Sequence, residues 1–272
     1  MTTDLPQLRC SDVVVTFRQK QARTVIHAVK SASLDVGAGE IVGLVGESGS
    51  GKSTLARAVV GLQRIDSGTI TFEGKAFGAR RSRADRRGIQ MVFQDPYGSL
   101  DPRMTIRGTL AEMLRRHTAL RGEAIETRCR ELMDMVRLPS SLLGSRPAGM
   151  SGGQRQRVAI ARALSIEPRL LVADEPVAAL DVSVQAGIVN LLSDLRDEVG
   201  LSILFISHDL SIVRTLCDRV NVIYRGEIVE ERPCAELFAD PRDDYTRTLL
   251  SAIPRLGGPR TEGLRDGQSL SR

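Results

Sequence analysis

The sequence predicts an α/β fold in which helices cover a mostly parallel sheet, with a β-rich layer near the N-terminus and a helical insertion. Two observations support this prediction. Short apolar stretches that favour strands alternate with amphipathic stretches that favour helices. Between about residues 105 and 165, however, only helical patterns occur. With 272 residues, of which 42% are hydrophobic, the chain can bury a sizeable core.

The N-terminal part is predicted to consist mainly of strands. The stretch EIVGLVG at 40–46 is short and apolar and ends in glycine, which is typical of a buried strand. A helical pattern follows at 52–62. The other expected elements are strands at 11–17, 25–36 and 88–94 and a hairpin at 66–77. The basic run ARRSRADRR at 79–87 is interpreted as a solvated loop, with a phosphate contact as the alternative.

The rest of the chain begins with the helical insertion, formed by the patterns TIRGTLAEMLRRH, IETRCRELMDMVRL and QRQRVAIARAL. Strands return at 169–174 and 202–207, each followed by a helical pattern. The stretch RVNVIYRGEIVEE at 219–231 is predicted to form a hairpin that turns at Arg225-Gly226. The Gly-, Arg- and Ser-rich stretch 254–272 is predicted to be a flexible tail.

Composition narrows the class of protein. Charged residues make up 26% of the chain and the net charge is +5, which fits an ordinary basic protein or one attracted to an anionic membrane or nucleic acid. Aromatic residues are only 3%, with no Trp, so stacking on bases is not indicated. No secretory signal and no apolar run of the ~18–20 residues needed to span a bilayer is seen. At a membrane, other chains would have to do the spanning.

The four cysteines are widely scattered and form no C-x-x-C pair. A metal cluster or a disulfide framework is therefore not expected, and reduced thiols in a cytoplasm are the default. The four residues are Cys10, Cys129, Cys217 and Cys234.

The strongest motif is GESGSGKST, which matches G-x-x-x-x-G-K-[ST] between a predicted strand and a predicted helix. Its glycines let the backbone curl so that N–H groups face phosphate oxygens. Lys52 would bring a positive charge to the β- and γ-phosphates, and the hydroxyl of Ser53 could bind Mg²⁺. The predicted phosphate-binding residues are Gly46, Glu47, Ser48, Gly49, Ser50, Gly51, Lys52, Ser53 and Thr54.

Polar residues that follow three predicted strands complete a candidate hydrolytic site. Asp174 and Glu175 end the apolar strand RLLVADEP, where Asp174 would hold Mg²⁺ and Glu175 would act as general base. His208, in FISHDL, could hydrogen-bond the γ-phosphate and hold the attacking water. Gln94 could bind Mg²⁺ or the water through its amide oxygen. A surface acidic pair, a structural histidine and a polar strand end are the alternative interpretations.

A second candidate anion site lies about a hundred residues after the first. The segment Ser151-Gly-Gly-Gln154 reads as a turn that opens a helix, and a helix N-terminus attracts anions through its free N–H groups and dipole. An ordinary helix cap would also explain it.

Together these motifs resemble, in kind and in order, the nucleotide-binding domain of ABC transporters, over about residues 8–253. The resemblance rests on the phosphate loop, Gln94, Ser151–Gln154, Asp174-Glu175, the ALD of 179–181 and His208. It implies an ATP-hydrolysing subunit with a P-loop NTPase, RecA-like core, an antiparallel β subdomain and an inserted α-helical subdomain at about 95–165. It also implies catalytic roles for Lys52 and Gln94 beside those of Glu175 and His208.

The resemblance further implies that two such domains pack head to tail with ATP between them. In that family the signature contacts the γ-phosphate held by the facing subunit, and here it corresponds to Ser151, Gly152, Gly153 and Gln154. Asp181 sits where the two sites communicate. Phe17 sits where an aromatic residue stacks on adenine, although it could instead be a core residue. Met150 stands where Leu is usual, a change of small expected effect.

Three stretches resemble the ATPases of peptide/nickel-type importers: VFQDPYGSLDPRMTI, DEPVAALDVSVQAGIVNLL and DDYTRTLLSAIPRL. In the last, Asp243-Asp244-Tyr245 stands where His-Pro-Tyr is usual. No cysteine follows Cys234, so an iron–sulfur cluster is not expected. The implied partners are a second ATPase chain, identical or different, two permeases and an extracytoplasmic binding protein, at the cytoplasmic face of the cell membrane. The alternatives are a soluble ABC ATPase acting on nucleic acid or the ribosome, and an exporter ATPase separated from its membrane half.

Overall fold

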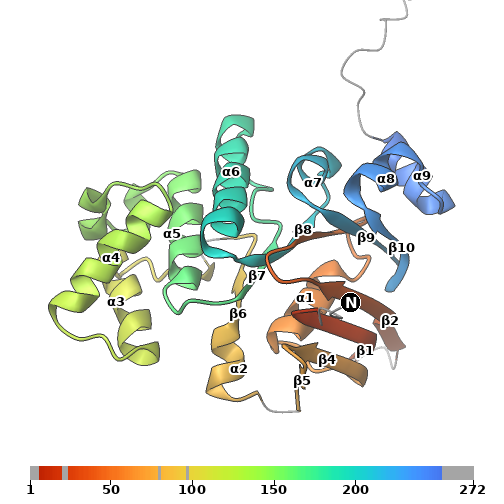
Figure 1. Cartoon of the computed structure of the whole chain (residues 1–272), viewed down its shortest axis with the longest axis horizontal. Coiled ribbons are helices and arrows are strands. Elements are labelled where there is room, and N and C mark those ends of the chain that lie inside the picture. The colour runs from red at the N-terminus through yellow and green to blue at the C-terminus, as the bar shows by residue number, and fades with distance from the viewer. Residues whose placement is uncertain (1–5, 20–23, 79–80, 96–97, 253–272) are drawn as a thin grey trace, which may run out of the picture.

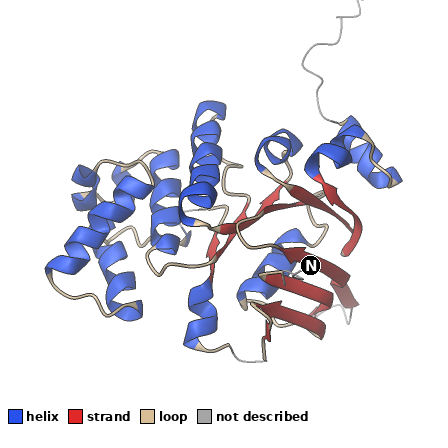
Figure 2. Cartoon of the chain, in the orientation of Figure 1, coloured by secondary structure: helices blue, strands red, loops and turns tan. Residues whose placement is uncertain are grey.

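The computed structural model describes residues 6–19, 24–78, 81–95 and 98–252. In this part of the chain the strands form one sheet in the order β5-β4-β1-β2-β10-β9-β3-β8-β7-β6 (Figures 1 and 2). The strands are β1 Leu8–Gln19, β2 Thr24–Val36, β3 Ile41–Val45, β4 Ser67–Phe72, β5 Lys75–Ala76, β6 Ile89–Val92, β7 Leu170–Asp174, β8 Ser202–Ser207, β9 Arg219–Tyr224 and β10 Glu227–Pro233. The predicted strands are confirmed, with ends that differ by a few residues.

The sheet has a parallel half and an antiparallel half. Strands β9, β3, β8, β7 and β6 run parallel to one another, and β10 pairs antiparallel with β9. Strands β1, β2, β4 and β5 pair antiparallel. A single pair, Glu227 on β10 with Ser31 on β2, joins the halves in parallel. The antiparallel half is the predicted β-rich N-terminal layer, and the α/β fold is confirmed.

The three central parallel strands carry the candidate site. Every residue of β3, β7 and β8 is buried, as expected for strands covered on both faces. Their register pairs Val45 with Ser207, and Asp174 with Ile206, so their carboxyl ends meet at one edge of the sheet. Open α/β sheets bind ligands at this edge.

The helices cover both faces of the parallel half. They are α1 Lys52–Val60, α2 Arg83–Gly88, α3 Ile106–His117, α4 Glu123–Met135, α5 Gly152–Leu164, α6 Val182–Val199, α7 Leu210–Leu216, α8 Cys234–Ala239 and α9 Asp244–Ser251. Alternate residues of β8 belong to different hydrophobic clusters: Ile203 faces the cluster of α6 and α7, and Leu204 faces that of α1 and the antiparallel strands. No helix in the described part of the chain is long and apolar enough to cross a bilayer.

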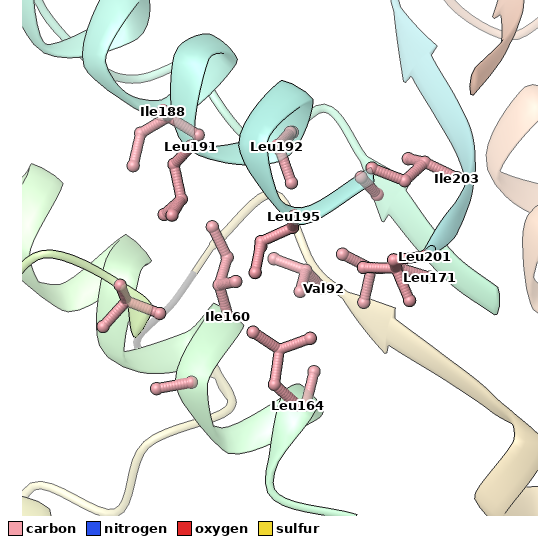
Figure 3. Packing of buried hydrophobic residues seen from close by; sticks show 14 of the residues in the cluster. Val92, Ile160, Leu164, Leu171, Ile188, Leu191, Leu192, Leu195, Leu201 and Ile203 are labelled. Atoms are coloured by element: carbon pink, nitrogen blue, oxygen red, sulfur yellow. The ribbon is translucent and has the colours of Figure 1, made fainter. Parts of the chain in front are cut away.

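Helices α3, α4 and α5 form the helical insertion, which lies beside the sheet (Figure 1). It shares a hydrophobic cluster with the parallel half. Figure 3 shows Ile160 and Leu164 of α5 close to Val92 of β6 and Leu195 of α6. The insertion is therefore packed onto the core, through α5, without contributing a strand to the sheet.

Truncating Ile160 tests this junction. Because Ile160 is fully buried, Ile160→Ala is expected to lower the free energy of unfolding by about 2–5 kcal/mol. Val199→Ala, at the exposed end of α6, serves as the control and is expected to change it by less than about 0.5 kcal/mol. Chemical denaturation of the purified chain measures both, and equal effects would contradict the packing described here.

Most described residues of the basic run are exposed, as expected of a solvated face, but the run is not a loop throughout. Part of it forms α2, whose capping residue Ser82 exchanges hydrogen bonds with Asp85. Arg81 turns inward instead: its Nη2 donates to the carbonyl oxygen of Ala58 at 2.7 Å, at the end of α1, and its guanidinium lies 3.9 Å from the Phe77 ring centre. The orphan carbonyls of a helix end attract a cation, which the sequence pattern alone did not reveal. The predicted tail at 254–272 lies outside the described residues.

Candidate functional site

The phosphate loop connects β3 to α1 and is pressed against two other strands. Gly46 and Gly51 have φ values of +153° and +111°. A Cβ on Gly46 would lie 2.2 Å from the carbonyl oxygen of Ile223, and one on Gly51 would lie 2.4 Å from that of Ala28. Only glycine fits at either position, because a side chain would collide with backbone and strain its own φ. The loop shape is therefore set by its neighbours on β2 and β9.

Lys52, the first residue of α1, is held inside the loop. It is only 4% exposed, and its Nζ donates to the carbonyl oxygens of Gly46 and Glu47, both at 2.7 Å. Burial lowers the pKa of Lys52, while the nearby carboxylates of Glu175 and Asp174 oppose that shift. The loop thus carries one ammonium group at the centre of its curve, where phosphate oxygens would bind.

Ser53 and Asp174 meet beside this lysine. The hydroxyl of Ser53 donates to Oδ1 of Asp174 at 3.0 Å. Asp174 is 5% exposed, and burial, with a contribution from the charge of Glu175, raises its pKa above the usual value despite the Ser53 hydrogen bond. A nearby positive charge would stabilise the ionised form of this carboxylate.

A hollow of about 340 Å³ opens over this pair, and Gln94 lines it together with Ser53 and Asp174. The structure therefore brings together the three residues predicted to bind Mg²⁺. A hydroxyl, an amide and a carboxylate are the oxygen donors that suit a hard cation, and Mg²⁺ usually takes few protein ligands. In the described part of the chain, no three His, Cys, Asp or Glu side chains form a metal cluster. The donor set fits Mg²⁺ held jointly with a phosphate.

Glu175 and His208 form a pair at the ends of β7 and β8. Glu175 has a φ of +48°, uncommon for a residue with a side chain, and its N–H donates to the carbonyl oxygen of Ile206 at 2.9 Å. Its Oε2 lies 3.2 Å from Nδ1 of His208. The glutamate side chain is 17% exposed and that of the histidine 60%. The charge of Glu175 also acts on Lys52, so the predicted base lies near the loop lysine.

The signature segment lies in a different part of the molecule. Ser151 caps α5: its hydroxyl accepts the N–H of Gln154 at 3.3 Å, while its own N–H donates to the Gln154 side chain at 3.0 Å. A Cβ on Gly153 would lie 2.3 Å from Cγ1 of Val184 on α6, so this glycine allows α5 and α6 to approach closely. The preceding residue, Gly152, is partly buried next to Leu180.

Within one chain, the signature and the phosphate loop do not come together. Figure 1 shows α5 among the helices of the insertion and α1 beside the antiparallel strands. Asp181, the N-cap of α6, is exposed in the same region as the signature and its carboxylate makes no capping hydrogen bond. Neither Ser151 nor Asp181 lines the hollow over Ser53 and Asp174.

Phe17 pairs with Ile26 across β1 and β2. Phe17 is 42% exposed and Ile26 50% exposed, so the alternative that Phe17 is a core residue was wrong. Because the ring of Phe17 is exposed, it can stack on another planar group.

One residue at the site was missed by sequence reasoning. The hydroxyl of Tyr245, on α9, accepts the backbone N–H of Glu47 in the phosphate loop at 3.0 Å. The two residues are 198 positions apart, and no local pattern links them. Asp243 belongs to the Asp243-Asp244-Tyr245 stretch that stands where His-Pro-Tyr is usual. It caps α9 by accepting the N–H of Tyr245 at 2.9 Å.

Comparison with known proteins gives consistent matches. Residues 29–178 match the family model described as ABC transporter. A Brucella abortus protein whose name describes an ATP-binding protein of peptide import is 47% identical over 264 residues, which is 93% of this chain and 79% of that protein. A Brucella ovis protein of similar name is 46% identical over 256 residues, covering 93% and 80%.

Two solved structures resemble the whole described fold. An ATP-binding cassette, solved as a dimer in a post-hydrolysis state with ADP and Pi, shares 29% identity with a TM-score of 0.74, covering 84% of this chain and 98% of its own. The protein cbiO1 from Clostridium perfringens, part of the transporter complex cbiONQ, shares 29% identity with a TM-score of 0.75, covering 86% and 91%.

Proposed function

The chain belongs to the ABC transporter family, and from this premise we propose that it is the ATP-hydrolysing subunit of an importer for peptides. Its ATPase activity follows from the family and from a 29% identical cassette that holds ADP and Pi. The peptide cargo is inferred from the names of relatives at 46–47% identity. These relatives favour transport over an action on nucleic acid or the ribosome.

One observation gives the ATPase assignment its strongest support. The parallel strands bring the loop lysine, the three oxygen donors that suit Mg²⁺ and the Glu175–His208 pair to one edge of the sheet. Lys52 begins α1 after the loop that follows β3, Asp174 ends β7, and His208 follows β8. A phosphate bound in the loop would have a cation on one side and a carboxylate base on the other. This is the arrangement that hydrolysis of a phosphoanhydride requires.

In the proposed mechanism, Glu175 accepts a proton from the water that attacks the γ-phosphate, and His208, at 3.2 Å, orients that carboxylate. Lys52 leaves the two loop carbonyls and stabilises charge on the β- and γ-phosphate oxygens. Ser53, Gln94 and Asp174 would hold Mg²⁺, which neutralises developing phosphate charge when it is bound.

We further propose that the working unit contains two ATPase chains. Because the signature at Ser151–Gln154 is separated from its own phosphate loop, it would complete the site of a facing subunit, with Asp181 linking the two sites. Phe17 is proposed to stack on adenine. We propose that the ATPase unit spans residues 8–253, with its helical subdomain at about 95–165.

Two permeases and an extracytoplasmic binding protein are the proposed partners, at the cytoplasmic face of the membrane. The cbiO1 neighbour is named as part of a transporter complex, which supports association with other chains. Gln94, which stands in the sequence between β6 of the core and α3 of the insertion, is proposed to pass the state of the γ-phosphate to the permeases.

Uptake of a radiolabelled tripeptide by cells that lack this gene tests the cargo. Wild-type chain is expected to restore uptake, and Lys52→Ala is expected not to, because the loop would lose its phosphate cation. Exposed Lys75→Ala, far from the loop on β5, is the matched control and should restore uptake fully. Unchanged peptide uptake in the deletion strain would contradict the proposed cargo.

A further inference from the structure

The C-terminal helix α9 reaches back to the phosphate loop through one side chain. The Tyr245 hydroxyl accepts the Glu47 N–H at 3.0 Å. Its ring packs on that of Tyr224, the last residue of β9, with ring centres 4.1 Å apart and planes 30° apart. The ring contact fixes where the hydroxyl lies, so the hydrogen bond does not depend on a freely rotating side chain.

Tyr224 stands just before the turn between β9 and β10, and this turn contacts the phosphate loop. Two residues after Tyr224, Gly226 donates its N–H to the carbonyl oxygen of Ser50 at 2.8 Å, and its own carbonyl oxygen accepts the N–H of Lys30 at 2.8 Å. The turn between β9 and β10 therefore supports the second half of the phosphate loop. Tyr245 adds a separate contact to its first half, at Glu47.

A buried carboxylate anchors the start of α9. Glu230 on β10 is 8% exposed, and its two oxygens accept the N–H groups of Arg242 at 2.9 Å and Asp243 at 3.0 Å. Burial alone would raise the pKa of Glu230, but these two donors, together with Thr246 and the charge of Arg232, outweigh it and hold the pKa below its usual value. The position of Tyr245 is thus determined by the sheet, two residues after the anchored pair.

Glu47 connects this anchor to the phosphate cation. Its N–H is taken by Tyr245, and its carbonyl oxygen accepts Nζ of Lys52 at 2.7 Å. Both backbone polar groups of one loop residue are therefore fixed, one from α9 and one from the lysine. Loss of the hydrogen bond between Glu47 and Tyr245 would let the loop move at the residue whose carbonyl oxygen holds Lys52.

We propose that Tyr245 is a positioning residue for nucleotide binding, which holds Glu47 so that the phosphate loop stays in the shape that receives the phosphates of ATP. Helix α9 is thereby a part of the ATP site. This inference rests on the proposed assignment of residues 46–54 as the phosphate-binding loop.

The test uses Tyr245→Phe in the full-length chain, because this change removes the hydroxyl and keeps the ring on Tyr224. Calorimetric titration is expected to show binding of Mg·ATP weakened by about 2- to 10-fold, the range for one neutral hydrogen bond. Binding of inorganic tripolyphosphate should weaken by the same factor, because the loop contacts phosphates only. In steady-state hydrolysis, KM should rise with kcat within about twofold of wild type.

Thr248→Val is the matched control. Its hydroxyl, also on α9, donates to the Asp244 carbonyl at 2.9 Å on the exposed side and does not reach the loop. This variant should bind both ligands as wild type does. Equal behaviour of Tyr245→Phe and Thr248→Val would overturn the proposal, as would a loss of ATP binding without a matching loss of tripolyphosphate binding.

Lys52→Gln separates failure of the inference from failure of the proposed site. If Lys52→Gln loses ATP binding while Tyr245→Phe binds normally, only the role of Tyr245 is wrong. If Lys52→Gln binds ATP normally, the phosphate-loop assignment itself is wrong. If Tyr245→Phe lowers the melting temperature, Tyr245→Leu provides a second variant. A loss of ATP binding that follows only the loss of melting temperature in these two variants would also overturn the proposal.

Discussion

Replacing Glu175 with glutamine is expected to reduce steady-state ATP hydrolysis by about 10²- to 10⁴-fold, the usual contribution of a general base. The amide has the same size and can still contact His208, whose Nδ1 lies 3.2 Å from the carboxylate, but it cannot accept a proton at neutral pH. Phosphate release by the purified chain measures the effect.

ATP binding should survive this change, because Lys52 and the Ser53–Asp174 pair remain in place. Since ATP then persists, a dimer stable in the presence of ATP is expected to accumulate, which size-exclusion chromatography detects. Glu198→Gln, on the exposed end of α6, is the control and should leave turnover unchanged. Turnover of Glu175→Gln close to wild type would show that another group acts as the base.

Replacing Ser151 with aspartate is expected to lower hydrolysis by about 10²-fold or more, while the isolated chain still binds ATP. Aspartate caps helices as well as serine does, so α5 should form normally. The added carboxylate would face the γ-phosphate of the opposite subunit and repel it, and the hydroxyl donor would be lost. Hydrolysis and ATP titration, measured side by side, separate the two effects.

Thr105→Asp is the control for this change. Thr105 caps α3 in the same way, by accepting the N–H of Gly108 at 3.1 Å, but it lies outside the signature. Near-normal hydrolysis is expected of it. If Ser151→Asp instead abolished ATP binding by the isolated chain, the signature would act on its own loop and the two-chain arrangement would be wrong.

Those parts of the site that depend on local sequence could be predicted. The phosphate loop is one continuous motif in which Gly46 and Gly51 are required by nearby backbone. Asp174 and His208 were also predictable, because parallel strands that end in polar residues bring those ends to one edge of the sheet. The sequence positions alone therefore indicate that these side chains lie at the same edge of the sheet.

Contacts between distant segments could not be predicted. Tyr245 meets Glu47 only because Glu230 fixes the residues before α9, and nothing near any of the three signals this. Arg81 reads as one more cation in a basic run, although it caps α1 from 23 positions away. The contact of Gly153 with Val184 likewise depends on how two helices cross. Each is a matter of tertiary packing.

The shared cluster around Ile160 limits how far the helical insertion can be treated as a module. Because α5 buries its apolar face against α6 and β6, an insertion transplanted from a relative would meet the wrong partner surface unless matching residues on those elements were exchanged as well. Chimaeras of such ATPases should therefore place their junctions so that Val92, Ile188 and Leu195 travel with the insertion. In this protein, the unit of exchange is larger than the stretch of chain that forms the insertion.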